Sequence, residues 1–295
     1  MILLLLVASL LCAQPKPEIT RVVLGGDVML ARHVRANAVR QKDAAFSFRK
    51  IADHFRTADL AFVNLESPFA ATGPYFEERM VFRAHPSMTE GLLLAGIDVV
   101  STANNHSRDA GPQGIAYTLE VLANSKIAAT GTSDPPVILE RRGVRFGFLA
   151  YTFDQRNGNH RDDDPRVAMT DPIRMAADVA ALKKHADIVI VSMHAGWEYW
   201  TKPNAHQVKF ARAAIDAGAA VVAGHHPHVA QPMERYRDGL IFYSLGNLVF
   251  DQAERPRVHQ GLVADVLFEG KMLQRYEVRP VRIRNTVPEL GTPLP

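Results

Sequence analysis

The stretch AAVVAGHHPHV, residues 219–229, runs from an apolar segment directly into three histidines arranged around a proline. The apolar part has the composition of a buried strand. Imidazole rings at the end of such a strand need hydrogen-bond partners, water or a metal ion, because burying an unpartnered polar group costs free energy. The stretch therefore predicts a buried strand that ends in a polar site at His225, His226 and His228.

Apolar segments of the same kind alternate with helical patterns along the chain, which is typical of an α/β domain. Two further segments, 137–153 and 261–284, are typical of antiparallel hairpins that turn at Arg142-Gly143 and at Gly270. No internal repeat or linker interrupts the pattern, so it predicts a single domain over residues 19–285 and a short tail over 286–295. The expected strands lie at 21–27, 60–66, 97–106, 187–194, 219–226 and 240–247, and the expected helices at 44–58, 111–126, 171–186 and 205–218.

The N-terminus departs from this pattern. Residues 1–12, MILLLLVASLLC, form an apolar run that is short for a bilayer span and is followed by a polar stretch with two prolines. Residues 1–18 are therefore predicted to be a signal peptide or an N-terminal export segment. We expect an exported protein, periplasmic or extracellular, or one held at the membrane through this segment. The single cysteine, Cys12, falls within it, which excludes disulfides and thiolate ligands from the mature domain.

Charge and composition limit the class of ligand. The 295 residues are 47% hydrophobic and 22% charged, which is typical of a globular protein. The formal net charge is +3 and the sequence pI is about 9.0, but lysine and arginine form no dense run. These observations predict no nucleic-acid partner, and the mildly positive charge favours an anionic substrate.

Side chains that can bind metal stand at the ends of five of the expected strands. In α/β sheets, ligands bind outside the carboxyl ends of the strands. Oxygen and imidazole donors without a thiolate suit Mn, Fe or Zn, and two such ions would activate a bridging water. His106, beside one of these donors, is placed to act as a general acid. The candidate ligands are Asp27, Glu66, Asn105, His194, His226 and His228.

Each of these residues alone also has an ordinary structural explanation. An aspartate at a strand end caps turns, an Asn-rich loop bonds to its own backbone, and a buried histidine is more often hydrogen-bonded than metal-bound. An α/β domain without metal is therefore the alternative, although the joint placement at strand ends favours the metal. Because neighbouring side chains of an extended chain point to opposite sides, we expect His225 to support the site or to be exposed rather than to share an ion with His226.

An ordered series of motifs over about residues 20–255 resembles the CapA-type poly-γ-glutamate capsule biosynthesis proteins, which belong to the calcineurin-like metallophosphoesterase superfamily. The resemblance implies a single-domain, four-layer α/β/β/α sandwich with a two-metal centre. It also implies an anionic polymer or a phosphorylated substrate, with membrane proteins of capsule synthesis as candidate partners. The motifs are GGDVMLAR (25–32), NLESP (64–68), ANNHSRDAG (103–111), HAGWEY (194–199), GHHPHV (224–229) and YSLGNLVFD (243–251).

The same resemblance implies a role for each matching residue. The six candidate ligands fall on metal-binding positions of the motifs, with Glu66 where the superfamily has a bridging aspartate. His106 falls on the position of the proton donor. Substrate-contacting or site-lining positions are implied for Arg32, Asn64, Ser244 and Asn247.

Two departures from the family pattern leave the activity open. Met29 stands where the first block of the superfamily usually has a histidine ligand, and Ala195 stands where the capsule family commonly has tryptophan. A metal-dependent protein of capsule biosynthesis that acts on an anionic polymer or its precursor is the first hypothesis. A secreted metal-dependent phosphoesterase is the second. A non-catalytic accessory that binds polymer for assembly or export is the third, and Met29 favours it.

Overall fold

The computed structural model describes residues 18–77, 80–132, 136–157, 160, 162–252, 254–255 and 257–294. The predicted export segment lies outside the described residues except for Glu18. Within the described ranges, no helix is both long enough and apolar enough to cross a membrane.

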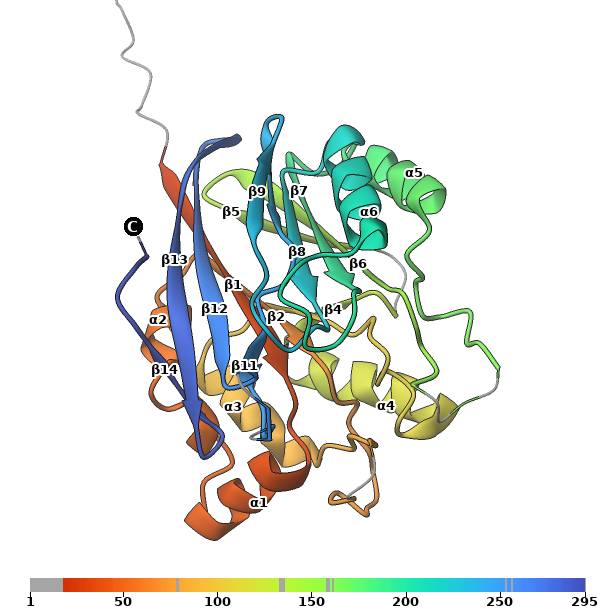
Figure 1. Cartoon of the computed structure of the whole chain (residues 1–295), viewed down its shortest axis with the longest axis vertical. Helices are drawn as coiled ribbons and strands as arrows, with labels where there is room; N and C mark the ends of the chain where they lie inside the picture. Colours follow the sequence, from red (N-terminus) through yellow and green to blue (C-terminus); the bar gives the residue numbers. More distant parts are fainter. Residues whose placement is uncertain are drawn as a thin grey trace, which may run out of the picture.

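An eight-stranded sheet forms one half of the fold (Figure 1). Its strands are, in spatial order, β14 (Val287–Leu290), β13 (Met272–Arg284), β12 (Gln260–Glu269), β1 (Ile19–Val28), β2 (Leu60–Leu65), β3 (Val99–Ser101) and β4 (Ala128–Thr130), and β11 (Asn247–Val249) also pairs with β1. The strands from β1 to β4 are parallel, whereas β12 to β14 form an antiparallel meander on the other side of β1. The residues that follow β1, β2 and β3 therefore emerge at the same end of this sheet.

A six-stranded sheet packs face to face against the first. Its strands are, in spatial order, β5 (Val137–Arg141), β6 (Val144–Thr152), β7 (Ile188–His194), β8 (Val221–His225), β10 (Gly239–Phe242) and β9 (Met233–Tyr236). β6, β7, β8 and β10 are parallel, and β5 and β6 form the predicted hairpin at Arg142-Gly143. Phe62 of β2 and Phe148 of β6 stack between the sheets, with ring centroids 5.9 Å apart.

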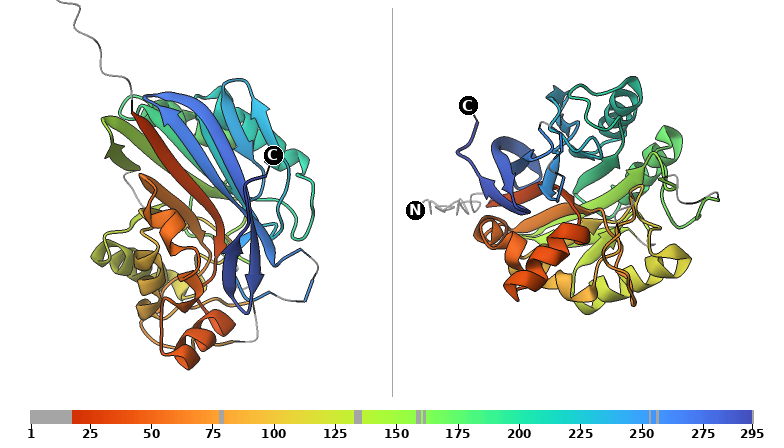
Figure 2. Two further views of the ribbon diagram at one scale, coloured as in Figure 1. Left: turned by 90° about the vertical axis from the view of Figure 1, so that its left-hand side faces the viewer. Right: turned by 60° about the horizontal axis from the view of Figure 1, so that its bottom comes forward.

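Helices cover the outer face of each sheet (Figures 1 and 2). The first sheet carries α1 (Arg32–Gln41), α2 (Ala52–Arg56), α3 (Thr89–Leu94) and α4 (Gly111–Asn124), and the second carries α5 (Pro172–Leu182) and α6 (Ala205–Asp216). Side chains of β1 alternate between the layers: Val22 and Leu24 pack between the sheets, and Val23 packs beneath the helices. The fold is therefore the α/β/β/α sandwich that the resemblance implied.

Two glycines let backbones approach one another at the sheet ends. A Cβ at Gly26 would lie 1.9 Å from the carbonyl oxygen of Gly246, and one at Gly224 would lie 2.0 Å from that of Tyr243. The amide of the neighbouring Asp27 donates a hydrogen bond to the same Gly246 oxygen, at 2.9 Å. The glycines of the GGD motif thus bring β1 close to the chain that leads into β11.

Several predicted elements have different bounds. The expected strand 97–106 is only β3, because Ser107 Oγ bonds to the backbone of Thr102 and Asn104 and turns the chain. The expected helix 44–58 is a short 3₁₀ turn (Phe46–Phe48) followed by α2. Helix α1 was not predicted, since it buries only Val34 and Ala38. The boundary predicted at 285 falls between two paired strands, because β14, in the predicted tail, pairs with β13.

Candidate metal centre

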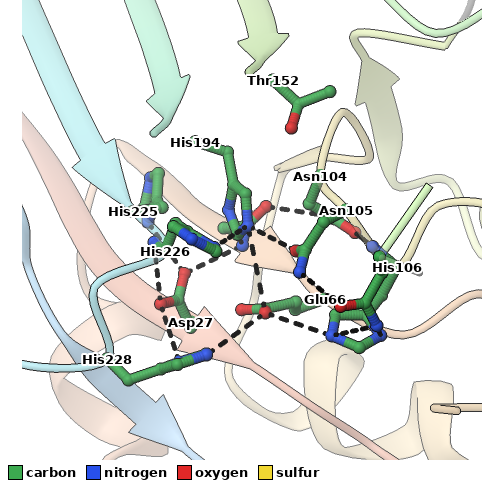
Figure 3. Close-up of polar contacts among 12 residues, drawn as sticks. Asp27, Glu66, Asn104, Asn105, His106, Thr152, His194, His225, His226 and His228 are labelled. Atoms are coloured by element: carbon green, nitrogen blue, oxygen red, sulfur yellow. Dashed lines mark hydrogen bonds and ion pairs between the residues drawn. The ribbon is translucent and has the colours of Figure 1, made fainter. Parts of the chain in front are cut away.

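The candidate ligands meet where the parallel strands of both sheets end (Figure 3). Asp27 lies near the end of β1, and Glu66 directly follows β2. His194 and His225 are the last residues of β7 and β8. The predicted residues therefore come from the strand ends of two facing sheets rather than from the edge of one sheet. The side chains are buried, none more than 4% exposed: Asp27, Glu66, Asn105, His106, His194, His225, His226 and His228.

Glu66 lies in the middle of this cluster (Figure 3). Its Oε1 is 3.6 Å from His228 Nε2 and 3.9 Å from His194 Nε2, and both of its carboxylate oxygens are buried without a hydrogen-bond partner. Burial, reinforced by the negative charge of Asp27, raises the pKa of Glu66 well above its usual value. A buried carboxylate that lacks donors and faces imidazole nitrogens is a group that a cation would stabilise.

Asp27 has partners where Glu66 has none. Asn64 Nδ2 donates to Asp27 Oδ1 at 2.8 Å, and the backbone amide of His226 donates to Oδ2 at 3.3 Å. His225 Nδ1 lies 3.3 Å from Oδ1, and His228 Nδ1 lies 3.6 Å from Oδ2. Burial alone raises the pKa of Asp27, but His225, His228 and Asn64 outweigh it and lower that pKa below its usual value. Asp27 is therefore the anionic side of the cluster.

His194 faces three other atoms that can bind metal. Its Nε2 lies 2.8 Å from Asn105 Oδ1, 3.2 Å from His226 Nδ1 and 3.9 Å from Glu66 Oε1. Burial, followed by the neighbouring histidines, lowers the pKa of His194 well below its usual value. Burial and His228 lower the pKa of His226 to about 3. Both rings are therefore neutral near pH 7, which is the protonation state that binds metal.

The donor set fits a divalent cation. Nitrogen and oxygen ligands about 2.1 Å from one ion lie roughly 3–3.5 Å apart, close to the 3.2–3.9 Å separations of the His194, His226, His228 and Glu66 donor atoms. Asp27, Glu66 and His194 each offer an atom within 4.8 Å of the others. All six predicted ligands are thus within reach of one cluster.

Asparagines orient the donor atoms. Asn247 Oδ1 lies 2.9 Å from His228 Nδ1, so this nitrogen donates its proton and Nε2 faces Glu66. Asn64 Nδ2 contacts both Asp27 and His194 Nδ1, the latter at 3.2 Å, and its Oδ1 accepts a bond from Asn104 Nδ2 at 3.3 Å. Partners of this kind fix the ring orientation of metal-binding histidines. Asn64 and Asn247, predicted to touch substrate, contact candidate metal-binding side chains.

His106 is locked in orientation beside Glu66. Its Nδ1 donates to Asp109 Oδ2 at 2.7 Å, and its Nε2 lies 3.9 Å from Glu66 Oε1. The Phe82 ring stacks on the imidazole with centroids 3.9 Å apart, and the Phe82 amide donates to the same Asp109 oxygen. Asp109 was not singled out from the sequence, although it lies in the quoted ANNHSRDAG motif.

The contacts of three further residues bear on the sequence expectations. The guanidinium of Arg32 binds Asp251 through Nε and Nη2, at 3.0 and 2.8 Å, so this fork is not free for substrate. Ser244 Oγ donates to the carbonyl of Val229 and accepts from the Gly246 amide, which places it in the turn before β11 rather than in the cluster. Of the two alternatives for His225, exposure is wrong, because the side chain is buried, and its contact with Asp27 agrees with a supporting role.

His225 is buried beside Asp27 because it lies on the same face of β8 as Val221 and Ala223, which pack between the two sheets. His226 has φ 95°, in the left-handed region, so the two neighbouring rings do not point to opposite sides. His228 has φ 57° as well. Met29, where the superfamily usually has a ligand, packs in the hydrophobic cluster under the helices.

Residues 21–252 match the family model described as "Bacterial capsule synthesis protein PGA_cap". The chain belongs to this family. It is 33% identical over 273 residues to the "PGA biosynthesis protein CapA" of Bacillus subtilis, covering 89% of this chain and 71% of the relative. It is 30% identical over 288 residues to a "Probable polyglutamine synthesis accessory protein" of Mycobacterium tuberculosis, covering 80% of this chain and 75% of the relative.

A solved structure confirms the fold. A Staphylococcus aureus protein described as "Putative 5'-Nucleotidase" superposes with a TM-score of 0.53 at 12% identity, over 94% of this chain and 53% of that chain. At this identity the likeness concerns the α/β sandwich alone. Membership of the capsule family rests on the sequence matches.

Proposed function

We propose that this chain is an exported capsule-biosynthesis protein, periplasmic or extracellular, whose buried centre binds divalent metal and acts on an anionic polymer or its precursor. The observation that supports metal binding is the environment of Glu66, a buried carboxylate without hydrogen-bond donors that lies among neutral imidazoles. The polymer is poly-γ-glutamate, since the chain belongs to the capsule family and resembles a protein named for PGA biosynthesis.

We propose two ions of Mn, Fe or Zn, held by Asp27, Glu66, Asn105, His194, His226 and His228. When bound, such ions supply Lewis-acid stabilisation of negative charge on a substrate oxygen. The chain's own contribution is to present these donors already oriented and out of bulk water, through Asn64 and Asn247.

His106 is the residue that we propose to move a proton. Because Asp109 accepts the Nδ1 proton, Nε2 is the nitrogen that faces the cluster. Nε2 takes up a proton to give an imidazolium, which the Asp109 carboxylate stabilises, and in this state the ring delivers the Nε2 proton to a leaving group. Phe82 prevents the ring from turning away. The carboxylate–imidazole pair thus sets both the tautomer and the direction of the ring.

Two cavities next to the centre offer room for a substrate. The Phe153 ring lies 4.7 Å from that of His226 and lines a cavity of about 580 Å³ together with Trp197. The Phe250 ring lies 4.9 Å from that of His228 and lines a second cavity of about 650 Å³. Trp197 and Trp200 are 55% and 56% exposed, so they are available as a wall for substrate.

Two other functions have an observation in their favour. Met29 packs in the core and supplies no ligand, which favours a polymer-binding accessory without catalysis. The His106–Asp109 pair beside the candidate metal cluster favours a secreted phosphoesterase. Membrane proteins of capsule synthesis are the partners expected under the accessory function.

Metal content tests the shared premise. We would measure bound metal by elemental analysis in the wild type, in His226→Ala and in His185→Ala, which removes an exposed histidine outside the cluster. Two equivalents of a transition metal, lost only in His226→Ala, are expected. One equivalent would reduce the centre to a single ion, and none after reloading a folded protein with Mn or Zn would refute the metal.

Activity assays then distinguish the three candidate functions. The metal-loaded protein is assayed on poly-γ-glutamate and on a panel of phosphate mono- and diesters. Metal-dependent cleavage of the polymer is expected. Cleavage of phosphate esters alone would support the phosphoesterase, and polymer binding that survives His106→Ala with no turnover of either class would support the accessory.

A further inference from the structure

A cavity of about 650 Å³ opens beside the candidate metal centre, between helix α1 and the chain that follows β11. The turn between β13 and β14 closes one wall, because Asn37 Nδ2 of α1 donates to the Asn285 carbonyl at 3.2 Å and to Thr286 Oγ1 at 3.1 Å. Figure 1 shows α1 and this turn at the same end of the molecule. The walls therefore come from three segments that are distant in sequence.

The cavity is joined to the centre by rings and by a hydrogen-bond network. Phe250 and Tyr199 line it, and their ring centroids lie 4.9 and 6.2 Å from that of His228. Asn247, which contacts His228 at 2.9 Å, also donates through Nδ2 to Gln252 Oε1 at 3.1 Å. Gln252 lines the cavity. A ligand that occupied the cavity would thus lie next to the metal-binding histidine.

Two arginines of the lining, Arg40 and Arg255, have no carboxylate partner among the described residues. Arg40, in the last turn of α1, donates to the neutral Asn37 Oδ1, and the Arg255 guanidinium lies 4.2 Å from the Tyr199 ring centroid. Among the residues that the structure describes, no carboxylate lies within 4.0 Å of the charged nitrogens of either arginine. Arg32 differs, because Asp251 neutralises it.

The remaining lining also suits a carboxylate-bearing chain. His33 and His259 are further nitrogen donors, and Glu254 is the one carboxylate among the described lining residues besides Asp251. Val258 and Ile283 are buried in the lining and offer apolar contact for methylene groups. Guanidinium forks match carboxylates in geometry and in charge.

We propose that this cavity is a subsite for the neighbouring repeat of an anionic chain whose reacting repeat lies at the metal centre, with Arg40 and Arg255 binding its carboxylates. The inference rests on the proposed function, since it takes the polymer as the ligand. It adds that the protein recognises more than one repeat, so affinity rises with chain length until the cavity is filled.

The test is binding rather than turnover. Fluorescently labelled γ-glutamyl oligomers of increasing length, from dimer to octamer, are titrated with the full metal-loaded chain and followed by fluorescence anisotropy. The wild type is compared with Arg40→Gln/Arg255→Gln. The control, Lys209→Gln/Arg235→Gln, removes the same charge from exposed residues of α6 and β9. Thermal unfolding and metal content verify that each variant is intact.

The expected result is a loss of about tenfold in octamer affinity in Arg40→Gln/Arg255→Gln, as two exposed charge-assisted contacts would give, with dimer affinity unchanged. The control variant should keep the gain with length, and an octamer with amidated carboxyl groups should show no gain.

Two outcomes would overturn the subsite. If the arginine variant binds octamer as tightly as the wild type, the cavity is not a carboxylate subsite, and the proposed function stands. An equal loss for dimer and octamer would place the arginines at the centre itself. If the metal-loaded wild type binds no oligomer of any length, the proposed polymer fails, and this inference fails with it.

Discussion

Replacing Glu66 by glutamine should show how this carboxyl group changes the free energy of unfolding, first in the metal-free protein and then with metal bound. Both of its oxygens are buried without hydrogen-bond partners, and burial raises its pKa. Above the usual glutamate range, a carboxyl group whose pKa is raised in the fold lowers stability, because the unfolded chain ionises it more readily. Glu66→Gln replaces it by a neutral polar group of the same size, so in chelator the variant should be as stable as the wild type, or about 1–3 kcal/mol more stable.

With metal bound, the wild type should instead be more stable than Glu66→Gln. A ligand present at about a thousand times its Kd adds about 4 kcal/mol to the free energy of unfolding. For a domain of this size each kcal/mol is worth about 2 °C in Tm, so the wild type should gain roughly 8 °C. Glu66→Gln should lose most of that gain, because a neutral amide replaces the anionic ligand that faces His194 and His228.

The assay is thermal unfolding at pH 7.5, in chelator and in excess Mn or Zn. Glu120→Gln, an exposed glutamate of α4, serves as the matched control and should behave as the wild type in both conditions. A Glu66→Gln protein that keeps the full metal-dependent rise would refute the ligand role. A metal-free variant that unfolds well below the wild type would show that the carboxylate is already satisfied by the fold.

Three further predictions follow from particular contacts. Asp109→Ala should lower, by about a hundredfold, the turnover of any substrate that the metal-loaded wild type cleaves. The reason is that His106 loses the hydrogen-bond acceptor that orients its ring, whereas the metal content should not change. Equal turnover rates in variant and wild type would show that Asp109 has no part in the reaction. Arg32→Ala should lower the free energy of unfolding, measured by urea denaturation, by about 2–3 kcal/mol. The substitution removes the bidentate partner of Asp251, whose side chain is 1% exposed. A loss below about 0.5 kcal/mol would show that the pair contributes little to stability. Hydrogen bonds from Arg145 and then Lys271 lower the pKa of Asp187, so this group stabilises the fold above the usual aspartate range. Part of that effect is already lost at pH 3, where the unfolded chain protonates this group and the fold does not. Asp187→Asn should therefore show a smaller fall in Tm between pH 7 and pH 3 than the wild type.

Much of the fold was predictable because its signals are local. The hairpin at Arg142-Gly143 follows from alternating side chains and a turn sequence within one short segment. The buried strands at 187–194 and 219–226 follow from continuous apolar runs. Helix α1 buries too few apolar residues to show a periodic pattern, and its place depends on packing that no local segment contains.

The candidate ligand types were likewise predictable, since the six residues stand at or shortly after the ends of strands and the motifs resemble those of the family. Their partners were not. Arg32 and Asp251 are 219 residues apart, and only the pairing of β1 with β11 brings their segments together. Asp109 lies three residues after His106, and its role depends on a turn that places both side chains against Phe82.

The types of candidate ligand, the α/β class and the family could be inferred from the sequence, because residue type, periodicity and motif order are properties of the chain. Which candidate ligands face one another depends on how the strands of the two sheets pack. His225 is the clearest case: its neighbour His226 adopts a left-handed backbone conformation, with φ 95°, where an extended one was expected. This conformation follows the end of β8, and it lets the His226 ring reach His194 in the buried cluster that His225 also faces.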